Sequence, residues 1–376
     1  MGNAITPLRC ATAGLLLAGA AVLVMGTAAV SATQSAGAAP IPINATDLVP
    51  TPNPSLAYND MAAAMGLFSK YGLTYVPGPK LGGGGPARVQ AIATGATEVA
   101  TSDIISAFGA IYSGADMRVL LVMTPYGDEE VWARNKYKTM KQAVGQTWAV
   151  ASLAGAQRFN AQMTAEGMGF KPDAFRFVAI PGADGPRLEA VDTGRTQLAS
   201  LSDLGGELAK AKGYTKQVHV LIPHTAKYTP PIPRLVVIAK ESWIKSHEEA
   251  ATRYVEMMLD AGRQWEDNAG AWVDPAEKIY KNSGLSRKQL DDAWQQFHNG
   301  GYFTINGGVN FAATQKIMNL FFKLRNESPN QYLSKPADVY DTGPLQAALD
   351  KMGLARGTPG LPDNPDWYHG KGTASK

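Results

Sequence analysis

Cysteine is nearly absent from this chain, which has one in 376 residues. That residue, Cys10, precedes an apolar run over residues 11–30, whereas a cysteine that anchors a lipoprotein would follow such a run. The sequence therefore predicts no lipid anchor. It also predicts a fold without disulfides, because removal of residues 1–32 would leave no cysteine at all.

Patterns that mark metal, nucleotide and nucleic-acid sites are missing as well. The five histidines are scattered without the spacing of a zinc site, and no G-x-S-x-G nucleophile motif is present. Residues 82–87 (GGGGPA) fit the dinucleotide fingerprint only loosely, and no P-loop Gly-Lys-Ser/Thr follows them. The net charge is +3, and the lysines and arginines form no basic run. We therefore expect no catalytic residue, no metal, no cofactor and no nucleic-acid partner.

The N-terminus has the three parts of an export signal. Arg9 precedes the apolar run, which ends in the small residues Val30-Ser31-Ala32, and a second possible cleavage site is Ala36-Gly37-Ala38. An uncleaved anchor is the alternative, because twenty residues are just enough to span a bilayer. Glycines and alanines make the run only weakly apolar, which favours a signal peptide over residues 1–32 and an exported protein.

A repeat organises the rest of the chain. Residues 88–100 (RVQAIATGATEVA) and 187–199 (RLEAVDTGRTQLA) align without a gap, and six of the thirteen positions are identical. Each copy reads as a short amphipathic helix, a Thr-Gly stop and a strand, with Gly-Pro just ahead. The repeat predicts two related α/β lobes that present helix N-termini and strand ends to a shared cleft.

The length fits two domains of ordinary size. We expect a first lobe over residues 44–138, a second lobe over 139–228, a return to the first lobe over 229–356 and a flexible tail over 357–376. Glu130 to Arg134 is expected as a strand of the first lobe, with crossings between the lobes near 135–140 and 222–233. Amphipathic helices are expected over 247–268, 287–297 and 311–326.

Two glycine-containing turns are candidates for ligand contact. Gly84 and Gly85 precede the first repeat helix, and residues 152–157 (SLAGAQ) precede a helix in the second lobe. Small residues let the backbone approach a ligand and leave the first-turn amides free to donate to an anionic or carbonyl oxygen. The alternative is that they only relieve crowding in two turns.

Two aspartates, Asp103 and Asp203, follow serines at the ends of predicted strands. The carboxyl ends of strands in an open α/β sheet are where ligands collect. Each carboxylate has three possible roles: accepting from an amine or ring N–H, capping a helix, or bracing the cleft through a salt bridge. Capping is the favoured role.

Several segments together resemble the periplasmic substrate-binding proteins of ABC importers, in the branch of taurine, alkanesulfonate and thiamine-pyrimidine binders. Residues 62–76 (AAAMGLFSKYGLTYV) resemble the family's opening pattern, and 84–103 resemble its "G......AL..G..D.A..D" segment. Residues 139–152 (TMKQAVGQTWAVAS) resemble "SLADLKGK.VAVS", and 235–243 resemble "VLVAS..FL". The resemblance extends over about residues 44–350. It is specific for the family and not for a ligand.

The resemblance implies an α/β, type II binding-protein fold, in which two doubly wound lobes are joined by a two-strand hinge. It implies ligand contacts at the following positions: Asn53, Ser55, Gly84, Gly85, Ser102, Asp103, Ser152, Gly155, Ala156, Gln157, Asp184, Gly185 and Asp203. Two departures from the family pattern remove hydroxyl groups. The usual G-S-G is all glycine here, and the usual Gly-Ser/Thr-x-His reads Ala154-Gly155-Ala156-Gln157. Both weaken an assignment to sulfonates, since oxyanions benefit from such donors.

On this basis we expect a soluble, monomeric periplasmic receptor that captures a small organic solute and delivers it to an ABC permease in the inner membrane, without chemical conversion. An exported enzyme on the same fold and a sensor subunit for a membrane kinase are the alternatives. The ligand's chemistry stays open at this point. Glycine-lined helix ends favour an anionic or carbonyl-bearing solute, whereas the aspartates favour an amine or ring N–H, and a zwitterion or a heterocycle would satisfy both.

Overall fold

The computed structural model describes most of the chain after residue 38. The described ranges are 39–47, 56–81, 84–125, 129–171, 173–202, 204–207, 213–214, 216–229, 233–281 and 284–354. The predicted signal segment with Cys10, the predicted tail over 357–376 and the candidate site residues Asn53, Ser55 and Asp203 lie outside these residues.

The first sheet has five strands in the order β2-β1-β3-β10-β4. The strands are β1 (Ile41–Thr46), β2 (Leu73–Pro77), β3 (Val99–Asp103), β4 (Arg118–Thr124) and β10 (Leu235–Ala239). β1 runs parallel to β2 and β3, whereas β10 runs antiparallel to β3 and β4. One strand of this sheet therefore comes from a much later part of the chain.

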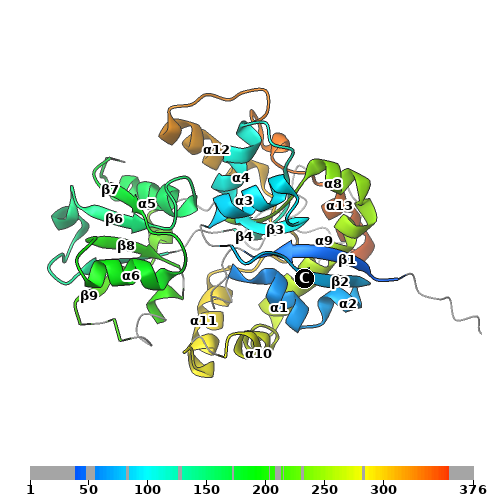
Figure 1. Cartoon of the computed structure of the whole chain (residues 1–376), viewed down its shortest axis with the longest axis horizontal. Helices are drawn as coiled ribbons and strands as arrows, with labels where there is room; N and C mark the ends of the chain where they lie inside the picture. Colours follow the sequence, from blue (N-terminus) through cyan, green and yellow to red (C-terminus); the bar gives the residue numbers. More distant parts are fainter. Residues whose placement is uncertain are drawn as a thin grey trace, which may run out of the picture. The chain divides into compact units, whose positions relative to one another are not determined.

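The second sheet repeats this plan, with the order β7-β6-β8-β5-β9. Its strands are β5 (Glu130–Arg134), β6 (Thr147–Val150), β7 (Arg176–Ala179), β8 (Leu198–Leu201) and β9 (Val218–Ile222). β6 runs parallel to β7 and β8, and β5 runs antiparallel to β8 and β9. In Figure 1 most of this sheet is green, and strands β1 to β4 of the first sheet are blue to cyan.

The assignment of Glu130–Arg134 to the first lobe is wrong. As β5 it pairs with β8 and β9 of the second sheet, so the chain belongs to the second sheet from Glu130 onward and does not cross near 135–140. The strand was expected beside β4 because the two are neighbours in sequence. Its central residues are buried, and a strand buried in this way needs a partner on each side, which only the second sheet offers.

Helices follow the parallel strands of both sheets. The first sheet carries α1 (Tyr58–Ala64), α2 (Leu67–Lys70), α3 (Gly85–Thr94) and α4 (Ile104–Tyr112), and the second carries α5 (Ala156–Gly167) and α6 (Asp184–Asp192). The helical stretch of α1 and α2 is not continuous. It is broken at Gly66, whose φ of 74° lies in the left-handed region that glycine adopts without strain.

The C-terminal third is helical. It comprises α8 (Glu241–Ser246), α9 (Glu248–Asp267), α10 (Ala269–Ile279), α11 (Arg287–Asn299), α12 (Phe311–Arg325) and α13 (Gly343–Met352). α10 was not predicted, since it contains Pro275, which usually marks a helix end. The side chain of Asn268 caps this helix by accepting from Gly270 N at 2.8 Å.

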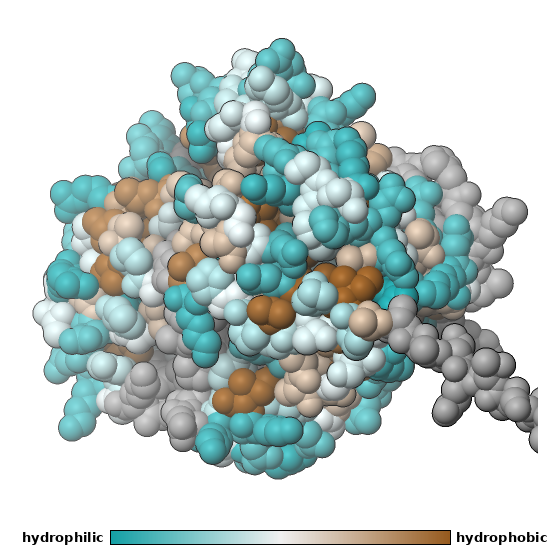
Figure 2. Space-filling model, turned by 45° about the vertical axis from the view of Figure 1, so that its right-hand side comes forward, coloured by the Kyte–Doolittle hydropathy of each residue, from teal (hydrophilic) through white to brown (hydrophobic). Residues whose placement is uncertain are grey.

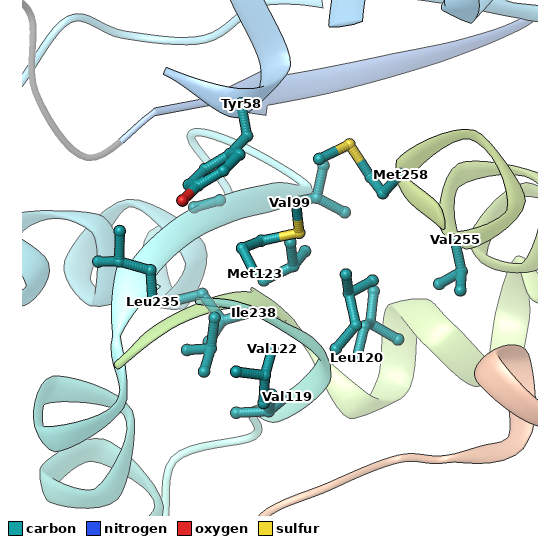
Figure 3. Packing of buried hydrophobic residues seen from close by; sticks show 14 of the residues in the cluster. Tyr58, Val99, Val119, Leu120, Val122, Met123, Leu235, Ile238, Val255 and Met258 are labelled. Carbon is teal, nitrogen blue, oxygen red and sulfur yellow. The ribbon is translucent and has the colours of Figure 1, made fainter. Parts of the chain in front are cut away.

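The C-terminal helices and the first sheet share one hydrophobic core, part of which Figure 3 shows around β3, β4 and β10. Tyr254, Met257, Met258, Trp265 and Phe321 are at most 1% exposed, as predicted from their helical spacing. Full burial of such a side chain contributes about 1.5–3 kcal/mol, so α9 and α12 are integral to the first lobe. The second sheet has two smaller core clusters of its own.

The surface shows no single apolar face on the side drawn in Figure 2, where hydrophobic residues form separate groups among hydrophilic ones. The large hydrophobic residues that are exposed lie far apart in the chain: Val76, Val144, Leu153, Tyr228 and Tyr332. In the described part of the chain, no helix combines the length and the apolarity that crossing a membrane requires.

Candidate functional site

The candidate site lies where β3 of the first lobe ends. Ser102 and Asp103, the last residues of this strand, are buried. Asp103 caps α4, because its Oδ1 accepts from Ser106 N and its Oδ2 from Ser106 Oγ, both at 2.8 Å. The favoured role of Asp103, helix capping, is thereby confirmed.

Asp103 also contacts the second lobe. Its Oδ1 accepts a further hydrogen bond from Ala156 N at 3.2 Å, and Ala156 is the first residue of α5. No side chain of the second lobe caps this helix. The carboxylate of one lobe therefore satisfies the leading amide of a helix in the other, as helix N-termini favour.

Gly85 is required by the close approach of Asp103. A Cβ at Gly85 would lie 1.8 Å from Asp103 Oδ2 and 2.5 Å from Ser106 Oγ. Ser102 Oγ donates to Gly85 O at 3.4 Å, which ties the start of α3 to the end of β3. Gly84, the N-cap of α3, has a φ of 69°. Part of the glycine-rich turn therefore exists to admit a carboxylate that belongs to the same lobe.

Burial raises the pKa of Asp103 above the usual range of an aspartate. The N–H and hydroxyl of Ser106, the positive charge of Arg234 and the N–H of Ala156 lower it without cancelling the effect of burial. Among the described residues, no lysine, arginine or histidine forms an ion pair with this carboxylate. Asp103 is thus a buried acid whose charge is balanced only by neutral donors and by a more distant arginine.

Asp184 holds the matching place in the second lobe but has different partners. It forms an ion pair with Arg187 and accepts from the hydroxyl of Ser202. Ser202 N lies 3.2 Å from each of its oxygens. These bonds use the carboxylate within its own lobe, and Gly185 beside it is half-buried.

The turn before α5 is closed by its own side chains. Ser152 Oγ accepts from Ala154 N at 3.1 Å, and Gln157 Oε1 accepts from Ala151 N at 2.7 Å. Gly155 is buried, and a Cβ there would lie 3.5 Å from Asp103 Oδ2 and 3.6 Å from Pro86 Cδ. The structure therefore brings together four residues at which the resemblance implies ligand contact: Gly85, Asp103, Gly155 and Ala156.

Two buried arginines were missed as functional candidates, although each opens a copy of the repeat. Arg88 Nη2 donates to Leu81 O at 2.6 Å, and Arg187 Nη1 donates to Ile180 O at 3.2 Å, so each arginine binds the carbonyl seven residues before it. Arg187 also holds Gly182 O at 3.0 Å. These bonds fix the turns that lead into α3 and α6. The signal was their identity at matched positions of the repeat.

A buried ion pair links the two segments that cross between the lobes. Arg234 Nη2 lies 2.5 Å from Glu129 Oε1, and both side chains are at least nine-tenths buried. Thr225 joins the same network, because its N donates to Glu129 O at 3.0 Å and its Oγ1 accepts from Glu129 N at 2.9 Å. The crossings are therefore held to each other at the base of the site.

A small hollow adjoins this network and has mainly apolar walls. Its lining residues come from α4, α5, the second crossing and α12: Ile104, Ile105, Ala156, Phe159, Asn160, Met163, Pro233, Arg234 and Ile317. Asn160 is 4% exposed and donates through Nδ2 to Thr225 Oγ1 at 3.1 Å. Its Oδ1 is buried and has no hydrogen-bond partner. One of the lining residues thus has an unused polar acceptor.

In the described ranges, no group of three or more histidine, cysteine, aspartate or glutamate side chains is placed to hold a metal ion. The chemical groups that meet at the site are carboxylate, amide and hydroxyl groups. They are suited to binding a small molecule through hydrogen bonds.

Solved structures share the architecture over about four fifths of this chain. A ligand-binding component of an ABC-type import system from Staphylococcus aureus, solved with zinc, matches with a TM-score of 0.63 at 14% identity, over 82% of this chain and 98% of its own. The alkanesulfonate-binding protein SsuA from Xanthomonas axonopodis pv. citri, bound to MOPS, gives 0.62 at 14%, over 81% and 98%. A Candida albicans protein with the generic periplasmic binding protein fold gives 0.57 at 10%, over 77% and 92%.

The chain has the periplasmic-binding-protein fold. The predicted fold class is confirmed: two α/β lobes with one strand order, joined by two crossings. No known family profile matches the sequence, and no curated protein sequence does. In this binding-protein fold, the first lobe comprises β1 to β4, β10, α1 to α4 and the C-terminal helices, and the second comprises β5 to β9, α5 and α6.

Proposed function

We propose that the protein is an exported solute-binding protein, which captures a small organic solute between its lobes and delivers it to an ABC importer. One observation carries the proposal. Two lobes of the same strand order meet at the starts of helices, where Asp103 of the first lobe bonds the leading amide of α5 in the second. Polar groups from both lobes at one place are what a cleft binder needs.

Hinge motion about the two crossings would open and close this site. The buried pair of Glu129 and Arg234 holds the crossings together, so the lobes can separate at the Asp103–Ala156 bond while the base stays intact. A ligand that contacts both lobes binds the closed form more tightly and shifts the population toward it. A permease can then recognise the closed shape.

The remaining features belong to the same proposal. The protein acts as a periplasmic monomer after cleavage of residues 1–32, is not lipid-anchored because Cys10 precedes the apolar run, and returns its ligand unchanged. Its partners are the solute and the permease of the inner membrane. ABC-type import and alkanesulfonate binding are properties of the similar proteins from Staphylococcus aureus and Xanthomonas axonopodis pv. citri, and they support the class of function proposed for this one.

Native mass spectrometry on protein purified without refolding is the first test, followed by thermal-shift screening of sulfonates, aromatic carboxylates, amino acids, amines and pyrimidines. We expect a bound or stabilising small molecule. X-ray scattering at saturation with that compound should show a smaller radius of gyration. A scattering profile that does not change at saturation would contradict hinge closure, and conversion of the compound would instead indicate an enzyme on this fold.

A further inference from the structure

We infer that the cleft selects a ligand whose nitrogen donates hydrogen bonds, an organic ammonium or an N–H heterocycle, and rejects sulfonates and carboxylates, because Asp103 already occupies the anion position at the start of α5. The inference deepens the proposed function and rests on it. It concerns the sign of the ligand's charge, which the fold does not determine.

The occupied amide is the first step. The N-terminus of a helix attracts anions, because its leading N–H groups have no partner in the helix and carry the positive end of the dipole. At α5 the leading N–H belongs to Ala156 and donates to Asp103 Oδ1 at 3.2 Å. A sulfonate or carboxylate at this place would have to displace Asp103 and then lie beside its negative charge. Placing like charges together in this way disfavours the ligand strongly.

The second step is that Asp103 has no direct ion pair among the described residues. Asp184, in the equivalent place of the second lobe, is neutralised by Arg187. Asp103 forms no such ion pair within the described residues, and its Oδ2 accepts a single hydrogen bond, from Ser106 Oγ. A carboxylate oxygen can accept two, so Asp103 retains capacity for an N–H donor. An ammonium group would also offset the desolvation of this buried acid.

The third step concerns the hollow beside Asp103 and does not depend on the charge of Asp103. Ala156, which bonds Asp103, and Ile104, which follows it, both line the hollow. Asn160 also lines the hollow, and its buried Oδ1 has no hydrogen-bond partner. An unused buried acceptor costs free energy that a ligand N–H would recover. The other walls are apolar except for Arg234, whose guanidinium is paired with Glu129, and apolar walls suit a small alkyl or aryl body on the same ligand.

The test uses three probes with one body and different head groups: n-butylammonium, n-butanol and n-butanesulfonate. Isothermal titration at constant ionic strength should rank the wild-type affinities in that order. Asp103→Asn should weaken n-butylammonium by roughly tenfold or more and improve n-butanesulfonate. Asn160→Leu should weaken n-butylammonium without improving the sulfonate. Asn160→Leu also keeps the test decisive if the Asp103 variant does not fold.

Glu256→Gln is the matched control. Glu256 lies on α9, is 4% exposed, and its carboxylate pairs with Lys351 Nζ of α13 at 2.8 Å. This variant should keep the wild-type order of affinities. A wild-type protein that binds n-butanesulfonate more tightly than n-butylammonium overturns the inference, and so does the absence of binding for all three probes. The receptor proposal stands separately if any other compound closes the lobes in scattering, and it falls if none does.

Discussion

Each lobe has a buried carboxylate between the end of a strand and the start of a helix. The carboxylate belongs to the strand end in the first lobe and to the helix start in the second. In the first lobe the acid is Asp103 at the end of β3, and it faces Gly85 at the start of α3. In the second lobe the acid is Asp184 at the start of α6, and it faces Ser202 after β8. Both pairs are related by the 99 residues that separate the two copies of the repeat. The acid and the small residue have exchanged places.

The exchange changes what the acid can do. Asp184 stands three residues before Arg187 and is neutralised inside its own lobe. Asp103 is bonded by the N–H and hydroxyl of Ser106 and by an amide of the other lobe. The carboxylate of the second lobe thus holds a turn of its own lobe, whereas the carboxylate of the first lobe bonds to the other lobe.

Substitution of the two repeat arginines should give the largest difference in unfolding free energy between the lobes. Arg187→Met leaves Asp184 buried without its cation, which typically costs about 3–5 kcal/mol of unfolding free energy. Arg88→Met removes hydrogen bonds to the carbonyls of Asp47 and Leu81 but no direct ion pair, so we expect a loss of about 1–3 kcal/mol. Urea unfolding of both variants measures the difference.

The control for the arginines is the double variant Asp184→Asn with Arg187→Met. Without the buried charge it should recover part of the free energy that Arg187→Met alone loses. If Arg88→Met and Arg187→Met lose the same unfolding free energy, hydrogen bonding to carbonyls, and not charge, explains how both arginines stabilise the fold.

Copying the second-lobe arrangement into the first lobe gives the next largest effect. Gly85→Asp alone places a side chain 1.8 Å from Asp103 Oδ2 and should cost about 1–3 kcal/mol. Asp103→Ser alone keeps a residue that can cap α4 but loses the carboxylate's bonds from Ser106 Oγ and Ala156 N, and it should cost about 1 kcal/mol. The double variant should be more stable than the sum of these losses by at least about 1 kcal/mol, because it places an aspartate three residues before Arg88.

A double-mutant cycle from urea unfolding measures this coupling. Additive losses would mean that the two positions do not form one carboxylate site. The matched control pairs Gly85→Asp with Asp116→Ser. Asp116 is bound to Ser242 elsewhere in the first lobe, so this cycle should show no coupling.

Much of the fold could be predicted because its strands and helices carry clear periodic patterns. The bounds of Glu130–Arg134 were predicted as observed, but the sheet to which it belongs was not. The residue pattern of a segment indicates a strand but does not indicate which strands pair with it. The break at Gly66 and the proline-containing α10 depend on local backbone conformation and tertiary packing, which override propensity.

Less of the site could be predicted, for a different physical reason. Asp103 was paired with Asp203, which lies outside the described residues, because each follows a serine. The 99-residue register of the repeat instead places Ser202 opposite Asp103, and the contacts of Gly85 and Asp184 agree with it. Arg88 and Arg187 stood at identical positions of the repeat, but arginine is rarely buried, so their role required the structure. Bonds between lobes, such as Asp103 to Ala156, leave no local sequence signal.

A third difference between the lobes, at the strands β1 and β6, predicts the smallest effect. β1 pairs with β3 as β6 pairs with β8, so Asp47 of the first lobe and Val150 of the second occupy equivalent positions. Asp47 is 7% exposed and accepts from Asn59 N at 3.1 Å, Asn59 Nδ2 at 3.0 Å and Asp60 N at 3.0 Å. Burial, reinforced by the nearby Asp60 carboxylate, raises the pKa of Asp47 to about 7, and these donors only partly offset it.

Because the pKa of Asp47 is higher in the folded protein than its ordinary value of 3.8, the folded state binds this proton more tightly than the unfolded state does. The resulting stability is complete below about pH 4 and is lost as the pH rises through about 7. Relative to Asp47→Asn, the unfolding free energy of the wild type should therefore fall between pH 4 and pH 7. Urea unfolding of both proteins at each pH unit from 4 to 8 measures the difference. Parallel curves would show that Asp47 stays ionised in the fold, held by its N–H donors, and that the two lobes do not differ in pH response at this strand end.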